Sequence, residues 1–286
     1  MPEQRRVRAA LGVGRWFPAD RQELNDMIAR FVESAVVPAL EGRVVSVISP
    51  HAGYEYSGPV AGYAYRAIRE DTVRHGPPET VVILGFGHRA AFRGVALLDG
   101  TAFATPLGLT PLDTESAAMM IAADPRITLD YRPHVGEHSA ENQVPFVQAV
   151  LPGAALVIAL MGGPDPALAG MLATVLARLA ARKRLLVVAS SDMLHDPDYE
   201  RVCATDRATL THVAALDSDG LREAWSYERQ IFCGIGPVTT ALQFAKEQGC
   251  TKGTVLRYRN SGDDHPESRG QWVVGYGAVA FATEAE

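Results

Sequence analysis

Apolar positions along the chain follow two patterns, short continuous runs and stretches with the helical period of 3.6 residues. A capping-box pair, Asp20 and Glu23, opens the first helical stretch, and apolar residues continue it at helical spacing up to Ala35. Runs of β-branched and aliphatic residues predict buried strands at residues 44–48, 81–84, 156–160, 185–189, 255–259 and 272–281. Helical spacing predicts further helices at residues 60–69, 115–123, 142–151, 167–181, 201–215 and 238–248.

This alternation of strands and helices predicts an α/β fold, with a central, mostly parallel sheet flanked by helices. No linker, internal repeat or shift in composition divides the chain, so we expect a single domain over residues 1–286. In open α/β sheets, ligands collect beyond the carboxyl ends of the strands. The residues that directly follow each strand are therefore the first candidates for chemistry.

Composition and charge exclude several classes of function. The chain carries 27 Lys plus Arg and 33 Asp plus Glu, a net charge of −6 with no run of five like charges, which argues against nucleic acid as a partner. No apolar run reaches the roughly 18 residues of a membrane span, and no signal-peptide segment follows the charged start. We therefore expect a cytoplasmic protein without a membrane partner. The basic residues are 24 Arg and 3 Lys, which favours a bacterial source.

Two histidines follow predicted strands. His51 comes after the run at residues 44–48, in a loop rich in polar and aromatic groups, and His88 comes after the run at residues 81–84, in a glycine-bent turn. A lone histidine at the end of a strand is usually structural. Two histidines from neighbouring strand ends can share one metal ion, since a neutral imidazole is the commonest protein ligand for Fe, Zn or Cu.

Other titratable groups lie in similar positions. Asp192 and His195 follow the run at residues 185–189, and a separate loop holds His134, Glu137, His138 and Glu141. If the sheet brings these segments to one edge, the site is dense in groups that bind or release protons. Glu137 and Glu141 also fit a paired-carboxylate acid/base system, although a spacing of four residues is more often a solvated helix face.

The three cysteines are an odd number at wide spacings and predict no disulfide framework. Cys233 stands just before a predicted helix that Pro237 can start, and the positive end of a helix lowers the pKa of a nearby thiol. This context favours a thiolate that acts as a metal ligand or a nucleophile. The alternative is a small buried hydrophobe, the commonest fate of a free cysteine. We interpret Cys203 and Cys250 as structural.

Two other kinds of site have partial signals. Gly85, Gly87 and Ala90 match the spacing of a dinucleotide-binding turn after a strand, but the strand is not the first, and Asp99 comes too early for the acidic residue that binds the ribose. A serine hydrolase would use Ser191 or Ser57 with a histidine and Asp192, yet the G-x-S-x-G elbow is absent from the sequence.

Several motifs occur together in the order of one family. They are GRWFP at residues 14–18, PHAGYEYSG at 50–58, TPLGL at 105–109, EHSAENQVPF at 137–146, SSDMLH at 190–195, CGIGP at 233–237, SGD at 261–263 and VGY at 274–276. On these motifs the chain resembles the Memo family, whose bacterial members include the B protein of the AmmeMemoRadiSam system. The family is distantly similar to class III extradiol dioxygenases. The resemblance implies a single α/β domain, in agreement with the hydrophobic pattern.

The resemblance also implies a metal site. His51, His88 and Cys233 match the family's two metal histidines and the cysteine that occupies the third ligand position, which is a carboxylate in the dioxygenases. His195 resembles the acid/base histidine of those enzymes, and His138 matches a histidine of the family that lies next to the metal ligands without binding the metal itself. Family members are reported to bind iron or copper, without a settled substrate.

Two positions depart from the family pattern beside the implied metal. The usual Pro-Ser before the second histidine is Phe86-Gly87 here, and Asp196 replaces a residue that is often Tyr. We expect these changes to reshape the substrate pocket without removing a ligand.

From the motifs and the strand ends we expect a mononuclear non-haem Fe(II) protein that performs O₂-dependent oxidation of a small phenolic or enediol-like substrate, with Cu or Zn as alternative metals. In this hypothesis His195 and His138 move protons, and Asp192 orients a ring nitrogen. Substrate contacts are assigned to three side chains of the same loops, Tyr54, Tyr56 and Glu141, although the tyrosines also fit packing against the first helix.

Two alternatives stay open. One is a non-catalytic signalling protein whose vestigial dioxygenase site binds a metal or a peptide or protein partner, since a cysteine replaces the carboxylate ligand of the dioxygenases. The other is hydrolysis at a bound Zn, which uses the same ligands but lacks a clear third oxygen or nitrogen donor.

Overall fold

The centre of the molecule is a sheet whose four middle strands run parallel. The computed structural model describes residues 6–89 and 91–284. The middle strands, in spatial order, are β2 (Val44–Ser49), β9 (Leu185–Ser190), β3 (Thr80–Phe86) and β8 (Ala155–Met161). Nearly every residue of these strands is buried. Strands covered on both faces read as continuous apolar runs, which is the reason that the sequence pattern found all four.

The strands outside this centre make the sheet mixed. β12 (Val273–Ala282) lies antiparallel to β2, to β10 (His195–Asp196) and to β11 (Gly253–Asn260). On the other side β4 (Val95–Leu97) is antiparallel to β8, and β7 (Ile127–Leu129) is parallel to β4. The predicted α/β class with a central sheet flanked by helices is confirmed, and the parallel arrangement holds for its centre and not for its edges.

A second, smaller sheet was not predicted. It consists of β1 (Val7–Ala9), β5 (Ala102–Thr105) and β6 (Gly108–Pro111), with β5 in the middle. Strands of three or four residues are too short to show a period in the sequence. The expected single domain over residues 1–286 extends at both ends beyond the described residues.

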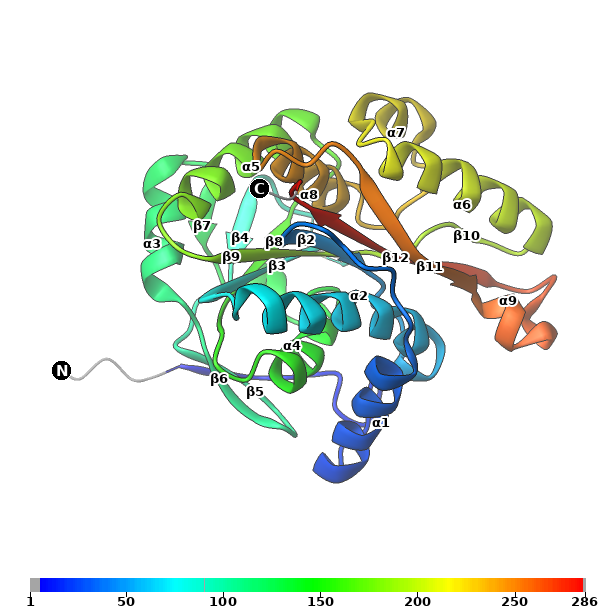
Figure 1. The fold of residues 1–286 in the computed structure, drawn as a ribbon, viewed down its shortest axis with the longest axis horizontal. Helices are drawn as coiled ribbons and strands as arrows, with labels where there is room; N and C mark the ends of the chain where they lie inside the picture. Colours follow the sequence, from blue (N-terminus) through cyan, green and yellow to red (C-terminus); the bar gives the residue numbers. More distant parts are fainter. Residues whose placement is uncertain (1–5, 90, 285–286) are drawn as a thin grey trace.

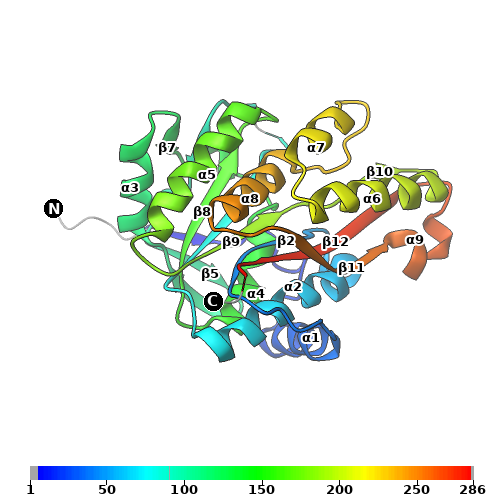
Figure 2. The ribbon, with the colours of Figure 1, turned by 45° about the horizontal axis from the view of Figure 1, so that its top comes forward.

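Helices cover both faces of the central sheet (Figures 1 and 2). One apolar cluster joins the sheet to α1 (Arg21–Ser34), α2 (Tyr54–His75) and α4 (Val144–Val150). The opposite cluster joins it to α3 (Thr114–Ala123), α5 (Pro166–Ala180), α6 (Tyr199–Ala214), α7 (Ser218–Ala224) and α8 (Ile235–Glu247). Short helices α9 (Ser261–Asp264), η1 (Arg132–His134), η2 (Glu141–Gln143) and η3 (Pro266–Ser268) lie in the connections. No helix among the described residues is long and apolar enough to cross a membrane.

The first two helices show how local signals and tertiary contacts combine. The Asp20 side chain accepts a hydrogen bond from the Glu23 amide at the start of α1, as the capping-box pattern predicts. α2 begins at Tyr54, earlier than predicted, and continues through Pro59. The Tyr54 ring is buried, and its hydroxyl donates a 2.7 Å hydrogen bond to the carbonyl of Asn142, so contacts with another segment fix the start of the helix.

Gly62 allows α1 and α2 to pack closely. A Cβ at this position would lie 2.4 Å from the backbone oxygen of Phe31, and backbone atoms cannot rotate away as a side chain can. We expect Gly62→Ala to lower the free energy of unfolding by about 2–3 kcal/mol in urea titrations. Gly153→Ala is the control, because its Cβ would meet nothing within 4 Å. Equal stability of the two variants would contradict this account of the packing.

Candidate metal centre

His51 and His88 lie at the carboxyl edge of the central sheet. His51 follows β2 by two residues and is buried, whereas His88 follows β3 by two residues and is exposed. β2 and β3 are both paired with β9, so their ends lie two strands apart. The ring centroids of the two histidines are 5.4 Å apart. The structure therefore brings together the pair that the sequence pattern singled out.

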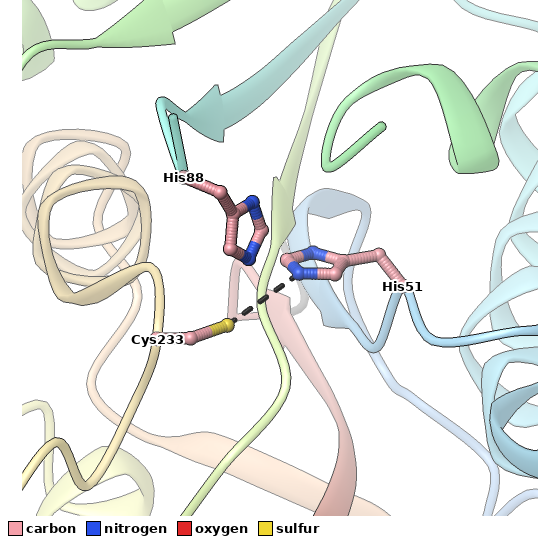
Figure 3. A group of neighbouring side chains, drawn as sticks. All are labelled: His51, His88 and Cys233. Atoms are coloured by element: carbon pink, nitrogen blue, oxygen red, sulfur yellow. Dashed lines mark hydrogen bonds between the residues drawn. The ribbon is translucent and has the colours of Figure 1, made fainter. Parts of the chain in front are cut away.

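Cys233 completes a group of three donors (Figure 3). It lies in the connection between α7 and α8, and its amide donates a 3.1 Å hydrogen bond to the carbonyl of Asp192. The sulfur lies 3.5 Å from Nε2 of His51, and one donor atom from each of His51, His88 and Cys233 lies within 4.8 Å of the others. A metal bound at about 2.0 Å from nitrogen and about 2.3 Å from sulfur holds its ligand atoms roughly 3.5 Å apart. The donor set therefore fits one metal ion.

Hydrogen bonds fix the tautomer of His51. The Ser190 hydroxyl donates to the carbonyl of Ser139 at 2.5 Å, so its oxygen is left to accept from Nδ1–H of His51 at 3.1 Å. The proton therefore sits on Nδ1, and Nε2 faces Cys233 with a free lone pair. Burial, followed by the nearby His88 and His138, holds the pKa of His51 well below its usual value. A neutral imidazole in this tautomer is ready to bind a metal.

Glu137 fixes the tautomer of His88. Its carboxylate accepts from Nδ1 of His88 at 2.9 Å and from the His88 amide at 2.7 Å. The amides of His138 and Ser139 donate to it as well. Burial alone would raise the pKa of Glu137, but hydrogen bonds from His88 and from backbone amides outweigh it and hold the pKa at about 2. Glu137 is therefore an anion that keeps the Nδ1 proton in place and leaves Nε2 of His88 available to a metal.

This role of Glu137 leads to a prediction for metal affinity. Glu137→Gln replaces the anion by a neutral amide, so Nδ1 of His88 loses its charged hydrogen-bond acceptor and the ring is less firmly oriented. We expect Fe(II) affinity to fall about 10- to 100-fold in anaerobic titrations. Glu79→Gln is the control, because Glu79 lies at the opposite edge of the sheet, where it accepts from the Arg184 amide. An unchanged affinity in Glu137→Gln would remove Glu137 from the site.

Asp192 has a different role from the one expected. Its carboxylate accepts from the amides of His51, at 2.7 Å, and Ala52, at 3.2 Å, so it holds the backbone of the histidine loop rather than a ring nitrogen. The ring nitrogen is held by Ser190 instead. Burial raises the pKa of Asp192, and the nearby His195 opposes that effect.

Two polar residues that the sequence reasoning did not assign also hold the His51 loop. Nδ2 of Asn142 donates to the His51 carbonyl at 2.6 Å, and Nε2 of Gln143 donates to the Pro50 carbonyl at 2.8 Å. Both residues are buried and lie in η2. They fall inside the motif at residues 137–146, which is the only sequence signal that points to them. Hydrophobic periodicity cannot find them, because they are buried polar residues.

The two predicted proton-transfer histidines differ in their surroundings. His138 is stacked between Trp16, with ring centroids 4.4 Å apart, and His88, at 4.6 Å. Burial, followed by the nearby His88, lowers the pKa of His138 to about 4. Nε2 of His195 is buried and has no hydrogen-bond partner among the described residues. Burial lowers the pKa of His195, while Asp192 acts in the opposite direction. Both rings are therefore neutral near pH 7.

His195 is positioned by contacts from two other elements. It pairs with Val274 of β12, and the neighbouring Leu194 amide donates to Asp206 of α6 at 3.2 Å. The Tyr258 hydroxyl donates to the same carboxyl group at 3.0 Å. A Cβ on Gly275 would lie 1.8 Å from Asp206 Oδ2, so glycine is required for this carboxyl group to fit.

The three predicted substrate-binding residues lie in unlike positions. Glu141 is buried, and its carboxylate accepts from the amides of Leu11 and Gly12 and from Arg8. The Tyr54 hydroxyl is likewise engaged, by Asn142. Tyr56 is 43% exposed and borders a cavity of about 230 Å³. Substrate binding by Tyr54, Tyr56 and Glu141 stays a prediction, and Tyr56 alone of the three has a large accessible surface.

The expected lowering of the Cys233 pKa is wrong for the metal-free protein. Burial, followed by the nearby Asp192 carboxylate, raises the pKa of the thiol, and hydrogen bonds to Ser191 and to backbone amides offset only part of this. The desolvation of the sulfur outweighs the helix end on which the prediction relied. A bound cation would be needed to keep this sulfur as a thiolate.

The competing interpretations of these loops lose support. Glu137 and Glu141 bind different partners, His88 and the segment around Gly12, and so do not act as a pair. A Cβ on Gly85 would lie 2.6 Å from the Ser139 hydroxyl, so this glycine allows two protein segments to pack. Ala90, the last position of the dinucleotide pattern, lies outside the described residues.

The fold and the site together define an α/β protein with a candidate metal centre of two histidines and one cysteine at the carboxyl edge of its sheet. Comparisons with known proteins identify the family. The sequence profile described as "Memo-like protein" matches residues 8–280. This chain belongs to the Memo family.

Individual relatives agree with this assignment. A MEMO1 family protein of Methanopyrus kandleri is 32% identical over 281 residues, which cover 94% of this chain and 96% of that protein. A MEMO1 family protein of Nitrosopumilus maritimus is 30% identical over 280 residues, covering 96% of this chain and 99% of that protein. A solved structure of an uncharacterized protein from Escherichia coli K12 has a TM-score of 0.54 at 15% identity, covering 84% of this chain and 100% of its own, and supports the fold alone.

Proposed function

We propose that this protein is a mononuclear non-haem Fe(II) enzyme that uses O₂ to oxidise a small phenolic or enediol-like substrate. One observation carries the proposal: His51, His88 and Cys233 offer three converging donor atoms, and both histidines have their remote nitrogen fixed by the protein. The exposure of His88 leaves one side of the donor set open to a substrate. Three protein ligands leave coordination positions free for other molecules.

The ferrous ion would supply Lewis acidity and a place where a chelating substrate and O₂ meet. The protein's own residues would do the rest. The unpartnered Nε2 of His195 is suited to accept the proton of a substrate hydroxyl and to return it later. Phe86 packs against His88 with ring centroids 4.1 Å apart, and it would limit the width of the substrate position on that side.

Oxygen uptake by the iron-loaded protein tests the proposal. We expect consumption of O₂ with at least one member of a panel of catechols and enediols, measured with an oxygen electrode. His195→Gln is expected to lower the rate about 100-fold or more while the iron content stays the same, because a general base contributes roughly 10²- to 10⁴-fold. His212→Gln is the control, since that histidine lies in α6 and pairs with Asp217.

Two results would contradict the proposal. One is full iron occupancy without O₂ uptake across the panel. The other is an unchanged rate in His195→Gln, which would remove the proposed base and leave the metal site standing.

A second candidate function is metal or peptide binding without turnover. The thiol of Cys233 favours it, because thiolate ligands suit Cu(I) and Zn as well as iron. Tight binding of Cu(I), or of a peptide partner, with no O₂ uptake by any metal-loaded form would support this candidate. Oxidation that depends on iron would oppose it.

A further inference from the structure

A large cavity lies away from the metal centre. It has a volume of about 560 Å³ and is bounded by α3, the amino-terminal half of β8 and the segments around Asp99 and Leu112. On α3 it is lined by Thr114, Ala117, Ala118 and Ile121, which share one face at helical spacing. A volume of this size falls within the roughly 300–1,000 Å³ of small-molecule sites.

The cavity is separate from the site described above. Its floor contains residues 156–158 of β8, whereas the loop of His88 meets β8 at its other end, where the Gly87 amide lies 3.4 Å from the Met161 carbonyl. Ile158, the lining residue of β8 nearest to Met161, lies three residues from it along the strand, or roughly 10 Å. α3, β4 and β7 lie together on the side of the molecule opposite to β10 and α9 (Figures 1 and 2).

The floor of the cavity has little need for hydrogen bonds from a ligand, and its walls carry the accessible apolar groups. Neighbouring strand residues point to opposite faces, so Val157 packs on the side of α3, whereas Leu156 and Ile158 pack with the cluster on the other face of the sheet. The accessible aliphatic side chains of the lining are those of α3 and of Leu129. The carbonyl of Ile158 already accepts from the Leu98 amide at 2.9 Å, and that of Leu156 accepts from the Asp113 amide at 2.7 Å. A ligand in this cavity therefore gains mainly from contact with the aliphatic side chains of α3 and Leu129.

The charged groups around the cavity are paired with one another. Arg6 and Asp99 form an ion pair at 2.5 Å. Asp113 receives hydrogen bonds from Ser116, Thr80 and Lys183, the last at 2.9 Å. The exposed pair of Arg6 and Asp99 costs little to open, but a charged ligand that separated the largely buried pair of Lys183 and Asp113 would leave an unpaired charge, which is costly.

We infer that this cavity is a second binding site, which takes an uncharged, largely apolar organic molecule of drug-like size. The aliphatic side chains of α3 and Leu129 supply the contact area, the backbone carbonyls of β8 already have hydrogen-bond donors, and the buried ion pair beside the cavity opposes an ionic ligand. The site needs no metal and shares no residue with the donors His51, His88 and Cys233.

Binding of Nile red, an uncharged apolar dye, tests the inference on the full chain. We expect a saturable increase in its fluorescence at about one dye per chain, and displacement by decan-1-ol at concentrations at which decanoate has no effect. Ala118→Phe puts a large ring over the cavity from an exposed position and is expected to weaken dye binding about tenfold or more. Ala123→Phe, on the opposite face of the same helix, is the matched control and should bind as the wild type does.

Three results would overturn the inference: no saturable binding of the dye, equal dye binding by Ala118→Phe and Ala123→Phe, or equal displacement of the dye by decan-1-ol and decanoate. If Ala118→Phe does not fold, Ile121→Ala offers a second test, because it removes apolar contacts from the same wall and should also weaken binding. Metal content is measured in parallel and is expected to stay at the wild-type level in every variant.

Discussion

Replacing Cys233 by serine is expected to lower the Fe(II) affinity of the protein by at least about 100-fold. Removing a supporting residue behind a ligand already costs roughly 10- to 100-fold, and Cys233 contributes one of the three donor atoms themselves. His51→Ala should have an effect at least as large. The measurement is metal content by mass spectrometry on protein purified without oxygen, followed by anaerobic titration with Fe(II).

Cys250→Ser is the matched control for that experiment. Cys250 is also a free cysteine, but it is buried after α8 and is not among the candidate donors. About one iron per chain in the wild type and in Cys250→Ser, together with its loss in Cys233→Ser, is the expected pattern. Full iron content in Cys233→Ser would show that the sulfur is not a ligand, whereas absence of metal from every form after loading with Fe(II), Cu(I) and Zn(II) would contradict the metal centre as a whole.

Asp206→Asn is expected to stabilise the metal-free protein at alkaline pH relative to the wild type. Asp206 is fully buried in α6, and burial raises its pKa to about 7, against the opposing effect of hydrogen bonds from Leu194 and Tyr258. The ordinary value is 3.8, so the folded state holds the proton more tightly than the unfolded state. The stability that this proton supplies is complete below pH 3.8 and is lost as the pH rises to about 7.

The asparagine cannot ionise and does not lose this stability. Between pH 5 and pH 8 the difference in free energy of unfolding should therefore move in favour of Asp206→Asn by about 2–3 kcal/mol. Urea titrations at several pH values measure it, with the surface variant Asp219→Asn as the control. A difference that is constant across this range would mean that Asp206 is ionised throughout.

The middle of the fold was predictable because strands that are buried on both faces consist of continuous runs of apolar residues. Strands β2, β3, β8 and β9 are continuous apolar runs, and the predicted ranges fall inside the observed ones. The edges were not predictable in the same way. β10 has two residues and β4 has three, and each is a strand only because a neighbour supplies its hydrogen bonds. Hydrogen bonds to a distant segment leave no period in the sequence.

The candidate site shows the same division. His51 and His88 were found because each follows a strand, and strand ends meet at one edge of the sheet. The supporting contacts of Ser190 and Glu137 join residues 139 and 49 positions apart, and no local rule pairs them. The prediction of a lowered pKa for the Cys233 thiol was wrong for a related reason. It used the nearby helix end, which the local sequence shows, but not the burial of the sulfur, which depends on distant segments.

The two candidate histidine ligands are oriented by Ser190, Glu137 and Asp192, all of them groups of the protein itself. The empty site should therefore have nearly its final shape, so that folding comes first and loading second. For the iron enzyme proposed above, a shortage of iron in the cell would then leave an intact, inactive apoprotein. A later supply of metal would activate this stored pool at once, without new synthesis, and the fraction of active protein would follow the metal available rather than the amount of chain made.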